Sequence, residues 1–290
     1  MYKDLIKSNA KLNFGLNILN KRDDNYHNID SIFVPIDLYD DLEINYTGKN
    51  GKIIIHTYSI NKISTEENII YKVYNEFYKN LKLKKNNTEK KEVIVKLKKN
   101  IPIFSGLGGG SSNGAFFLKS LNKYYGNIFS IEEMINFSKN ISADIPFFLY
   151  NTPSRIKGIG EIIEEIKINF KVNIILIKPN FGISTKLAYE NIKKIDNVKY
   201  SNIEKVVEGL KKNDVKLVES NIENVLDQGL FTNTDIIEFK KKFTLLFENI
   251  KLNMSGSGSC FYIFDYYNSN LIEKLKFSFP EFLIIKCKLV

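Results

Sequence analysis

The chain has little cysteine and no long hydrophobic run, and each absence excludes a class of protein. Its 290 residues include only two cysteines, Cys260 and Cys287, and neither belongs to a paired motif. A disulfide framework or a cysteine-based zinc site is therefore not expected, whereas a reducing, cytoplasmic setting is. No apolar segment is long enough to span a bilayer. Residues 12–19 are apolar but interrupted by Asn13 and Asn17, so we expect neither a signal peptide nor a membrane partner.

The composition, with 43% hydrophobic and 26% charged residues, is typical of a globular protein. A chain of 290 residues can form one large domain or two modest ones. The formal net charge of +9 raises the possibility of a nucleic-acid partner, but the lysines are scattered. Their densest run, residues 82–91, lacks aromatics and arginines and is typical of a solvated loop. We therefore expect no nucleic-acid partner, although the positive field would attract an anionic substrate.

The most informative segment is residues 106–113, Gly-Leu-Gly-Gly-Gly-Ser-Ser-Asn. It follows an apolar, strand-like segment at 93–97 and precedes a segment with helical spacing of apolar residues. Those apolar residues are Ala115, Phe116, Leu118 and Leu121. Glycines allow positive φ and close backbone approach, and a helix N-terminus presents unpaired N–H groups and a positive dipole end. We interpret the segment as a phosphate-binding loop in preference to a merely flexible one.

Two familiar phosphate motifs do not match this loop. A P-loop requires lysine and then serine or threonine after its last glycine, whereas Gly110 is followed by Ser111 and Ser112. A dinucleotide fingerprint counted from Gly106 would need glycine where Ser111 stands. The loop belongs to a third kind.

Four other positions are candidates for chemistry. Lys11 lies in an apolar, strand-like stretch, where the ordinary interpretation is a lysine whose stem reaches solvent. His27 follows a polar run, and its alternative role is a loop or capping residue. Asp144 is expected between a helix end and an extended apolar segment at 146–150, so its carboxylate needs a cationic or hydrogen-bonding partner. A second glycine–serine loop occupies residues 255–259.

The pattern predicts an α+β fold, because strands and helices are mixed without regular βαβ alternation. Capping boxes predict helices opening at Ser64 and Ser130. Further helices are expected from residue 184, near 202–211, at 236–247 and at 271–275. Strands are expected at 53–55, 93–95, 172–177, 260–264 and 282–285, with a turn region at 154–160. We place two domains at 1–155 and 156–290.

Together these motifs resemble the GHMP kinases, whose phosphate loop reads approximately P-x-x-x-G-L-G-S-S. Residues 102–112 match it with two extra glycines before the serines. The resemblance extends from about residue 8 to residue 265. The other matching motifs lie at 10–13, 26–28, 143–146, 158–161 and 254–260. Ser105 and Ser142 stand where the family usually has glycine, which puts loop dihedral angles in question more than the chemistry.

The resemblance implies a nucleotide-binding N-terminal domain like the second domain of ribosomal protein S5 and a ferredoxin-like C-terminal domain. It also implies transfer of the γ-phosphoryl group of ATP, with Mg²⁺, to an alcohol. Asp144 would be the general base and Lys11 its charge partner, with Asn68 and Lys99 on the adenine side. Ser111 or Ser112 would lie near the magnesium ion. The implied phosphate-binding residues are Gly106, Leu107, Gly108, Gly109, Gly110, Ser111 and Ser112.

Within the family, the chain is most similar to the branch whose acceptor is cytidine diphosphate methylerythritol. His27 would then read the edge of the cytosine, and the rings of Tyr26 and Tyr189 would stack on the two faces of this base. The remaining acceptor-binding residues implied are Asn13, Thr185, Gly256 and Gly258. The alternatives are another GHMP small-molecule kinase, acting on homoserine or in the mevalonate pathway, and a non-catalytic nucleotide-binding protein of the same fold. We expect a monomer or homodimer in a bacterial cytoplasm, or the mature form of an organellar protein.

Overall fold

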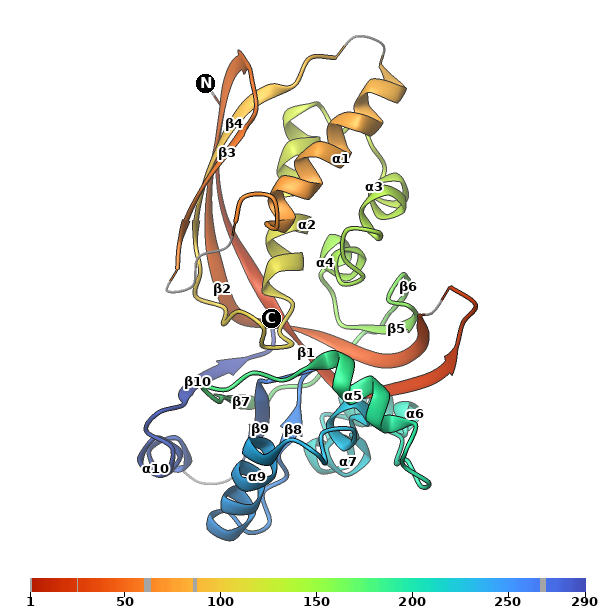
Figure 1. Ribbon diagram of the computed structural model, residues 1–290, viewed down its shortest axis with the longest axis vertical. Helices are drawn as coiled ribbons and strands as arrows, with labels where there is room; N and C mark the ends of the chain where they lie inside the picture. The colour runs from red at the N-terminus through yellow and green to blue at the C-terminus, as the bar shows by residue number, and fades with distance from the viewer. Residues whose placement is uncertain (1, 25, 60–63, 86–87, 267–269) are drawn as a thin grey trace. The chain divides into compact units, whose positions relative to one another are not determined.

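The computed structural model describes residues 2–24, 26–59, 64–85, 88–266 and 270–290, which form two compact units (Figure 1). The first unit comprises Met1–Ala10, Leu38–Ile103 and Gly108–Thr152, and the second comprises Lys11–Asp37, Phe104–Leu107 and Pro153–Val290. The chain leaves the first unit for the last time near the expected boundary at 155. Segments 11–37 and 104–107 nevertheless belong to the second unit, so the division into 1–155 and 156–290 stays a prediction about domains.

Two long strands run through both units, and the first unit adds two strands and four helices. The long strands are β1 (Tyr2–Lys21) and β2 (His27–Asn50). The others are β3 (Ile53–Tyr58), β4 (Lys91–Lys98), α1 (Ile69–Lys84), α2 (Gly109–Tyr124), α3 (Ile131–Ser138) and α4 (Ile145–Tyr150). In this unit β4 pairs with β3 in parallel and with β2 in antiparallel fashion. Figure 1 shows the four helices on one side of these strands.

The helix α1 confirms the expected apolar face but begins later than its sequence signal. Ile70, Val73 and Phe77 are buried along that face. The side chain of Ser64 does accept a hydrogen bond from the Glu67 amide, as a capping box requires, but the two residues form a turn ahead of the helix. The side chain of Asn68 caps the helix. A second polar residue close to the start therefore displaced the cap by one turn.

Two segments differ from the prediction. The apolar stretch at 146–150 is the helix α4 and not an extended segment. It is buried on almost all sides, which removes the periodicity that would indicate a helix, and Pro146 suits a first helical turn. Residues 154–158, expected as a turn, form the strand β5 (Ser154–Gly158). On α2, Phe117 is buried and Phe116 only half-buried, whereas we had assigned Phe116 to the core face.

The second unit contains a four-stranded antiparallel sheet in the order β10-β7-β9-β8. In chain order these strands and the helices α5 and α10 give β-α-β-β-α-β, which confirms the ferredoxin-like expectation. The strands are β7 (Asn173–Lys178), β8 (Asn253–Met254), β9 (Phe261–Asp265) and β10 (Leu283–Lys288). The helices are α5 (Thr185–Ile192), α6 (Ile203–Lys212), α7 (Val215–Asn221), α8 (Val225–Gln228), α9 (Thr234–Leu246) and α10 (Leu271–Ser278).

One face of this sheet forms the main core of the second unit. Ile175, Phe261 and Ile263 from the strands pack with Phe239 and Phe243 of α9. The helices α7 and α8 had no counterpart in our sequence prediction. Both are short, and a run of four to seven residues shows too little periodicity for a helix to be recognised. The unit also holds β5 and β6 (Ile162–Glu165), which extend antiparallel from the first half of β2.

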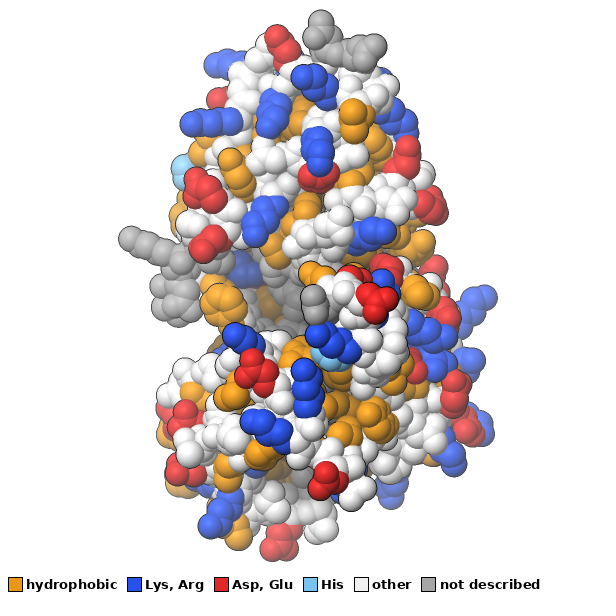
Figure 2. Space-filling view, turned by 45° about the vertical axis from the view of Figure 1, so that its right-hand side comes forward, with side chains coloured by type: hydrophobic (Ala, Val, Ile, Leu, Met, Phe, Trp, Pro, Cys, Tyr) orange, Lys and Arg blue, Asp and Glu red, His pale blue; other side chains and the backbone are white. Residues whose placement is uncertain are grey.

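The surface carries mixed charges. Figure 2 shows lysine and arginine side chains spread over the visible face and interspersed with aspartate and glutamate. This distribution agrees with the interpretation of the +9 charge as scattered. Among the described residues, no helix combines the length and apolar character needed to cross a bilayer.

Candidate active site

The glycine loop leads directly into α2 in the first unit. Gly108 is the N-cap and has a φ of 71°, in the left-handed region that favours glycine. The amide of Ser112 donates to the carbonyl of Gly108 at 2.9 Å, so it is already used within the helix. Among the described residues, the amides of Gly109, Gly110 and Ser111 donate to no other group. The sequence predicts phosphate-binding amides from Leu107 to Ser112, and three of those in α2 therefore have free N–H groups among the described residues.

A buried ion pair supports the start of α2. Lys99 and Asp40 form it, with side chains that are 6% and 0% exposed. Asp40 also accepts from the amides of Asn100 and Ile101 at 2.7 and 2.8 Å. The ammonium of Lys99 lies 3.2 Å from the point where a Cβ on Gly109 would stand. A cation therefore lies beside the three helix-end amides, where both favour an anion.

The other predicted residues of the first unit occupy helix ends. Asn68 is buried as the cap of α1, with its side chain accepting from the Ile70 amide at 3.0 Å. Asp144 is the N-cap of α4. The sequence placed Asp144 against an unfavourable helix C-terminus, and this was wrong, because the segment that follows is helical. A carboxylate at a helix N-terminus lies at the favourable end of the helix dipole.

The serines of α2 provide few oxygen ligands. The hydroxyls of Ser111 and Ser142 lie 2.8 Å apart, and the buried Ser112 hydroxyl has no partner among the described residues. The described residues contain no group of three or more His, Cys, Asp or Glu that would hold a metal. Such a sparse donor set fits Mg²⁺, which keeps waters and phosphate oxygens in its shell and needs few protein ligands.

In the second unit, the two glycine–serine loops meet. The Ser255 hydroxyl lies 3.2 Å from the carbonyl oxygen of Gly106. A Cβ on Gly106 would stand 2.0 Å from the Ser255 carbonyl oxygen, so this position requires glycine for space as well as for its φ of 75°. The amide of Lys11 donates to the carbonyl of Leu107 at 3.0 Å. The first two residues of the phosphate loop are thus held between β1 and the 255–259 loop.

Lys11 and Asn13 lie on the same face of β1 and form a polar group inside an apolar core. Both are 2% exposed, and the Lys11 ammonium donates to Asn13 Oδ1 at 2.5 Å. The same ammonium lies 4.4 Å from the centroid of the Phe33 ring. Lys11 therefore does not extend to solvent, and the ordinary interpretation offered for it was wrong. A buried ammonium is costly unless it is well partnered.

Asn13 is fixed on several sides, in part by residues that the sequence did not single out. Its side-chain amide donates to Ser31 Oγ at 3.2 Å, and Ser31 in turn donates to the Gly15 carbonyl at 2.5 Å. The buried Tyr262 hydroxyl donates to the backbone carbonyl of Asn13 at 2.9 Å. Ser255 approaches Asn13 Oδ1 at 3.4 Å. No sequence signal marks Ser31 or Tyr262, because each becomes significant only through pairing with a distant strand.

An aromatic pair forms the third part of the site in the second unit. The rings of His27 and Tyr189 lie with centroids 5.2 Å apart and planes inclined by 31°. Burial lowers the pKa of His27, and Lys193 and Lys21 lower it further. Tyr26 is 61% exposed, and Thr185 is exposed at the first position of α5. Two of the three predicted cytidine-side residues, His27 and Tyr189, are thus together, whereas Tyr26 and the other predicted acceptor-binding residue, Thr185, lie at the surface.

Comparison with known proteins agrees with this fold. Residues 68–152 match the family model described as the GHMP kinases N-terminal domain. A crystal structure of 4-(cytidine 5′-diphospho)-2C-methyl-D-erythritol kinase superposes with a TM-score of 0.77 at 23% identity, covering 99% of both chains. Homoserine kinase from Cytophaga hutchinsonii superposes with a TM-score of 0.73 at 14% identity, covering 99% of this chain and 94% of that one. The fold is that of the GHMP kinases.

Two relatives are closer in sequence. A 4-diphosphocytidyl-2-C-methyl-D-erythritol kinase from Fusobacterium nucleatum is 41% identical, over 98% of this chain and 97% of the relative. One from Clostridioides difficile is 34% identical, over 87% and 83%. The chain belongs to the 4-diphosphocytidyl-2-C-methyl-D-erythritol kinase family, and the protein is therefore a phosphotransferase, with ATP as the phosphate donor.

Proposed function

We propose that this kinase phosphorylates the 2-hydroxyl of 4-diphosphocytidyl-2-C-methyl-D-erythritol. The identity of 41% to a kinase of that name, over almost the whole of both chains, carries the proposal. The His27–Tyr189 pair supports it, since a base needs an aromatic surface and a polar edge. Neither homoserine nor mevalonate has a base for such a pair to bind. A small phosphorylated acceptor also suits the positive net charge.

In this proposal Asp144 removes the proton from the attacking hydroxyl. A tertiary alcohol is a hindered and weak nucleophile, so alignment and proton removal both contribute. Asp144 is the N-cap of α4, at the positive end of the helix dipole. Lys11 supplies a positive charge that stabilises the developing alkoxide. Its rigid partners, Asn13 and Phe33, keep that charge oriented before the substrate arrives.

The glycine loop holds the triphosphate of ATP. Lys99, which the family resemblance places on the adenine side, lies beside Gly109, so its ammonium also adds positive charge near this loop. The amides of Gly109, Gly110 and Ser111 are the donors in α2, with Gly106 and Leu107 shaping the approach. Bound Mg²⁺ neutralises charge on the transferred phosphoryl group. Ser111 or Ser112 would offer it a hydroxyl. Asn68 lies on the adenine side, where its visible role is to fix the start of α1.

The cytidine end of the acceptor lies against His27, Tyr26 and Tyr189. Because the pKa of His27 is lowered, its imidazole is neutral near pH 7 and offers one donor and one acceptor nitrogen. That combination matches the N4 donor and N3 acceptor of cytosine. Stacking on the two tyrosines would add about 1–3 kcal/mol per base. The methylerythritol phosphate end lies at Asn13, Thr185, Gly256 and Gly258.

A direct test compares turnover of three alcohols by the purified protein with Mg-ATP. We expect ADP release with 4-diphosphocytidyl-2-C-methyl-D-erythritol and none with homoserine or mevalonate. Turnover of homoserine or mevalonate alone would leave the kinase class intact but overturn the cytidine roles of Tyr26, His27 and Tyr189.

The role of Asp144 is tested by Asp144→Asn, which keeps the shape and removes the base. We expect kcat to fall about 100- to 10,000-fold, the range that general-base catalysis contributes, while ATP binding stays near normal. Asp214→Asn is the matched control, because Asp214 caps α7 by accepting from Leu217 and lies outside the site. Unchanged turnover in Asp144→Asn would remove this residue as the base.

A further inference from the structure

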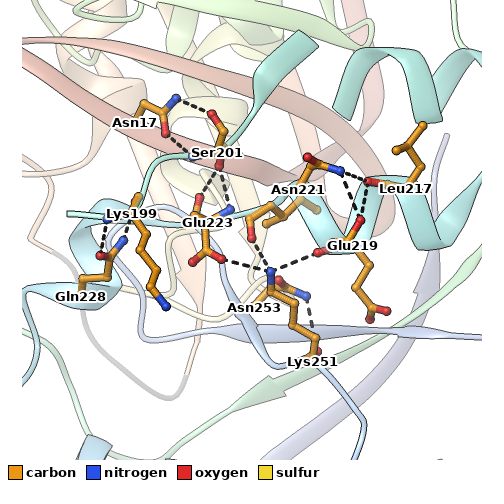
Figure 3. A network of polar contacts seen from close by, with 12 residues as sticks. Asn17, Lys199, Ser201, Leu217, Glu219, Asn221, Glu223, Gln228, Lys251 and Asn253 are labelled. Atoms are coloured by element: carbon orange, nitrogen blue, oxygen red, sulfur yellow. Dashed lines mark hydrogen bonds and ion pairs between the residues drawn. The ribbon is translucent and has the colours of Figure 1, made fainter. Parts of the chain in front are cut away.

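A polar network fixes one segment of the second unit against β1 (Figure 3). Asn17 and Ser201 exchange two hydrogen bonds, from Asn17 Nδ2 to the Ser201 carbonyl at 3.0 Å and from the Ser201 amide to Asn17 Oδ1 at 2.8 Å. The Ser201 hydroxyl then bonds both the carbonyl and the amide of Glu223, at 2.6 and 2.7 Å. The Leu16 amide donates to the same Glu223 carbonyl at 2.9 Å. Residue 223 is therefore held directly on β1.

Lys251 secures the same segment from its other side. Its ammonium donates to the carbonyls of Glu219 and Ile222 at 3.1 and 2.5 Å and lies 3.4 Å from Glu223 Oε1 (Figure 3). These carbonyls belong to the last turn of α7 and the residues after it, where a cation is favourable. Asn224, the next residue, therefore follows a segment whose backbone is fixed by hydrogen bonds on two sides.

Asn224 uses all of its side-chain hydrogen-bonding groups on two different segments. Its Oδ1 accepts from the amides of Leu226 and Asp227, which caps α8. Its Nδ2 donates to the carbonyls of Met254 and Gly256, at 2.9 and 2.8 Å. The side chain is buried, so water does not replace these bonds easily. One amide therefore ties the second glycine–serine loop to the segment fixed on β1.

The loop that Asn224 holds contacts a residue proposed to bind the acceptor and a residue of the proposed ATP phosphate loop. Ser255 lies between the two carbonyls that Asn224 binds, and its hydroxyl reaches Asn13 and Gly106. Gly256 has a φ of 56°, and a Cβ there would lie 3.3 Å from Asn13 Oδ1. A displacement of this loop would move the neighbours of Asn13, whose Oδ1 binds the Lys11 ammonium.

We propose that Asn224 is a positioning residue, which holds the 254–256 loop so that Ser255 and Gly256 fix the acceptor beside Asn13 and Lys11. The proposal rests on the function proposed above for these residues. Asn224 acts through the loop and does not touch the reacting groups. A misplacement of about 1 Å in a reacting geometry can cost up to about 100-fold in rate, so a single anchoring amide can matter.

The test compares Asn224→Asp with Asn233→Asp. The aspartate at 224 keeps the acceptor that caps α8 but places a carboxylate oxygen against two carbonyls, where a donor is needed. Asn233 caps α9 by accepting from Ile236, so Asn233→Asp makes the same chemical change at a helix cap outside the loop. Asn224→Ala, which removes both functions, is the second variant at the site.

We expect Asn224→Asp to lower kcat/KM for the acceptor about 10- to 100-fold, with a lower kcat and a larger rise in KM for the acceptor than for ATP. Asn233→Asp should match the wild type in all three. Hydrogen exchange of the peptide covering 253–260, whose amides at Ser255 and Gly258 are bonded within the loop, should be faster in Asn224→Asp and unchanged in Asn233→Asp.

The outcomes separate the two proposals. Exchange and kinetics in Asn224→Asp equal to those in Asn233→Asp would overturn the positioning role, as would faster exchange with unaltered kinetics. If the wild type turns over no cytidine compound while exchange still rises in Asn224→Asp, the anchoring of the loop stands and the proposed substrate fails. Unfolding of Asn224→Ala alone does not bear on the comparison, because Asn224→Asp retains the cap.

Discussion

At the scale of single residues, the environment of Lys11 indicates a role in the reaction more than a role in stabilising the fold. Its ammonium is buried, donates to Asn13 and lies over Phe33. Replacing a buried charge with an apolar side chain of similar volume is often neutral or stabilising. Lys11→Met should therefore lower kcat about 100- to 1,000-fold, as expected for loss of one transition-state charge contact, with little fall in Tm.

Lys98→Met is the control for this change, since Lys98 is an exposed lysine on β4. Steady-state kinetics and thermal unfolding of both variants provide the comparison. A large fall in Tm with kcat preserved would show that Lys11 serves the core of the second unit and not the reaction.

His27 gives a prediction with a definite sign. Burial and two lysines lower the pKa of His27 from its usual 6.5, so the neutral imidazole still predominates at pH 6.5 and the protonated form increases as the pH falls further. A protonated imidazole has no acceptor nitrogen, so KM for the cytidine substrate should be constant from pH 8 to about 6.5 and rise below that.

The chain has only two histidines, which makes the titration simple to follow by NMR. His56→Gln removes the other imidazole signal and assigns that of His27. A midpoint at or above 6.5 in the free protein would contradict the neutral imidazole that the cytosine assignment uses.

At the scale of elements, the phosphate loop depends on Gly106, a position where no residue with a side chain fits. Gly106 and Gly126 have φ values of 75° and 77°, but a Cβ at Gly106 would collide with the Ser255 carbonyl, whereas Gly126 has nothing within 4 Å. Gly126→Ala should cost only the left-handed strain, about 1–2 kcal/mol of unfolding free energy. Gly106→Ala should cost more and also lower kcat/KM for ATP, because two backbone segments must separate.

Chemical denaturation and ATP kinetics of both alanine variants measure this difference. Equal losses of unfolding free energy, with ATP kinetics unchanged in Gly106→Ala, would show that the two glycine–serine loops separate at no cost. The close approach of Gly106 to Ser255 would then have no part in shaping the phosphate loop.

The elements also show which sequence signals are sufficient to predict a helix and the residue at which it begins. The amphipathic face of α1 was predicted correctly because its apolar pattern is long. The start of α3 was predicted correctly because its capping box is complete. The Ser130 box of α3 forms both of its reciprocal bonds. The helix α4 was missed because its residues are apolar on nearly every side, and this error reversed the expected electrostatics of Asp144. A boundary error of a few residues can therefore change the chemistry assigned to a side chain.

At the scale of the whole molecule, the sequence predicted motifs better than the pairing between them. Lys11, Asn13 and the two glycine–serine loops were identified as separate candidates. Their partners Ser31, Tyr262 and Asn224 were not, because no local pattern reports hydrogen bonds between residues that lie 18, 249 and 32 positions apart, respectively. For the same reason the sequence could not show that 11–37 and 104–107 pack with the later part of the chain.

The net charge of the whole molecule leads to a last prediction. A protein with a formal charge of +9 and mixed surface charges attracts ATP and a diphosphate substrate through a diffuse field. The range of that field falls from about 30 Å at 0.01 M salt to about 8 Å at 0.15 M. Thus kcat/KM for both substrates should fall as salt increases, while kcat, which reports the bound complex, should stay nearly constant.

Lys205→Glu combined with Lys216→Glu tests whether the scattered charge is responsible. Both lysines are exposed in first turns of helices, where glutamate suits the dipole, and the double change lowers the formal charge from +9 to +5, since each reversal removes two units. The salt dependence of kcat/KM should become shallower in this variant, with kcat unchanged. An equally steep dependence would mean that a few charges beside the bound phosphates, such as Lys99, attract the substrates, and that the remaining lysines have no part in their capture.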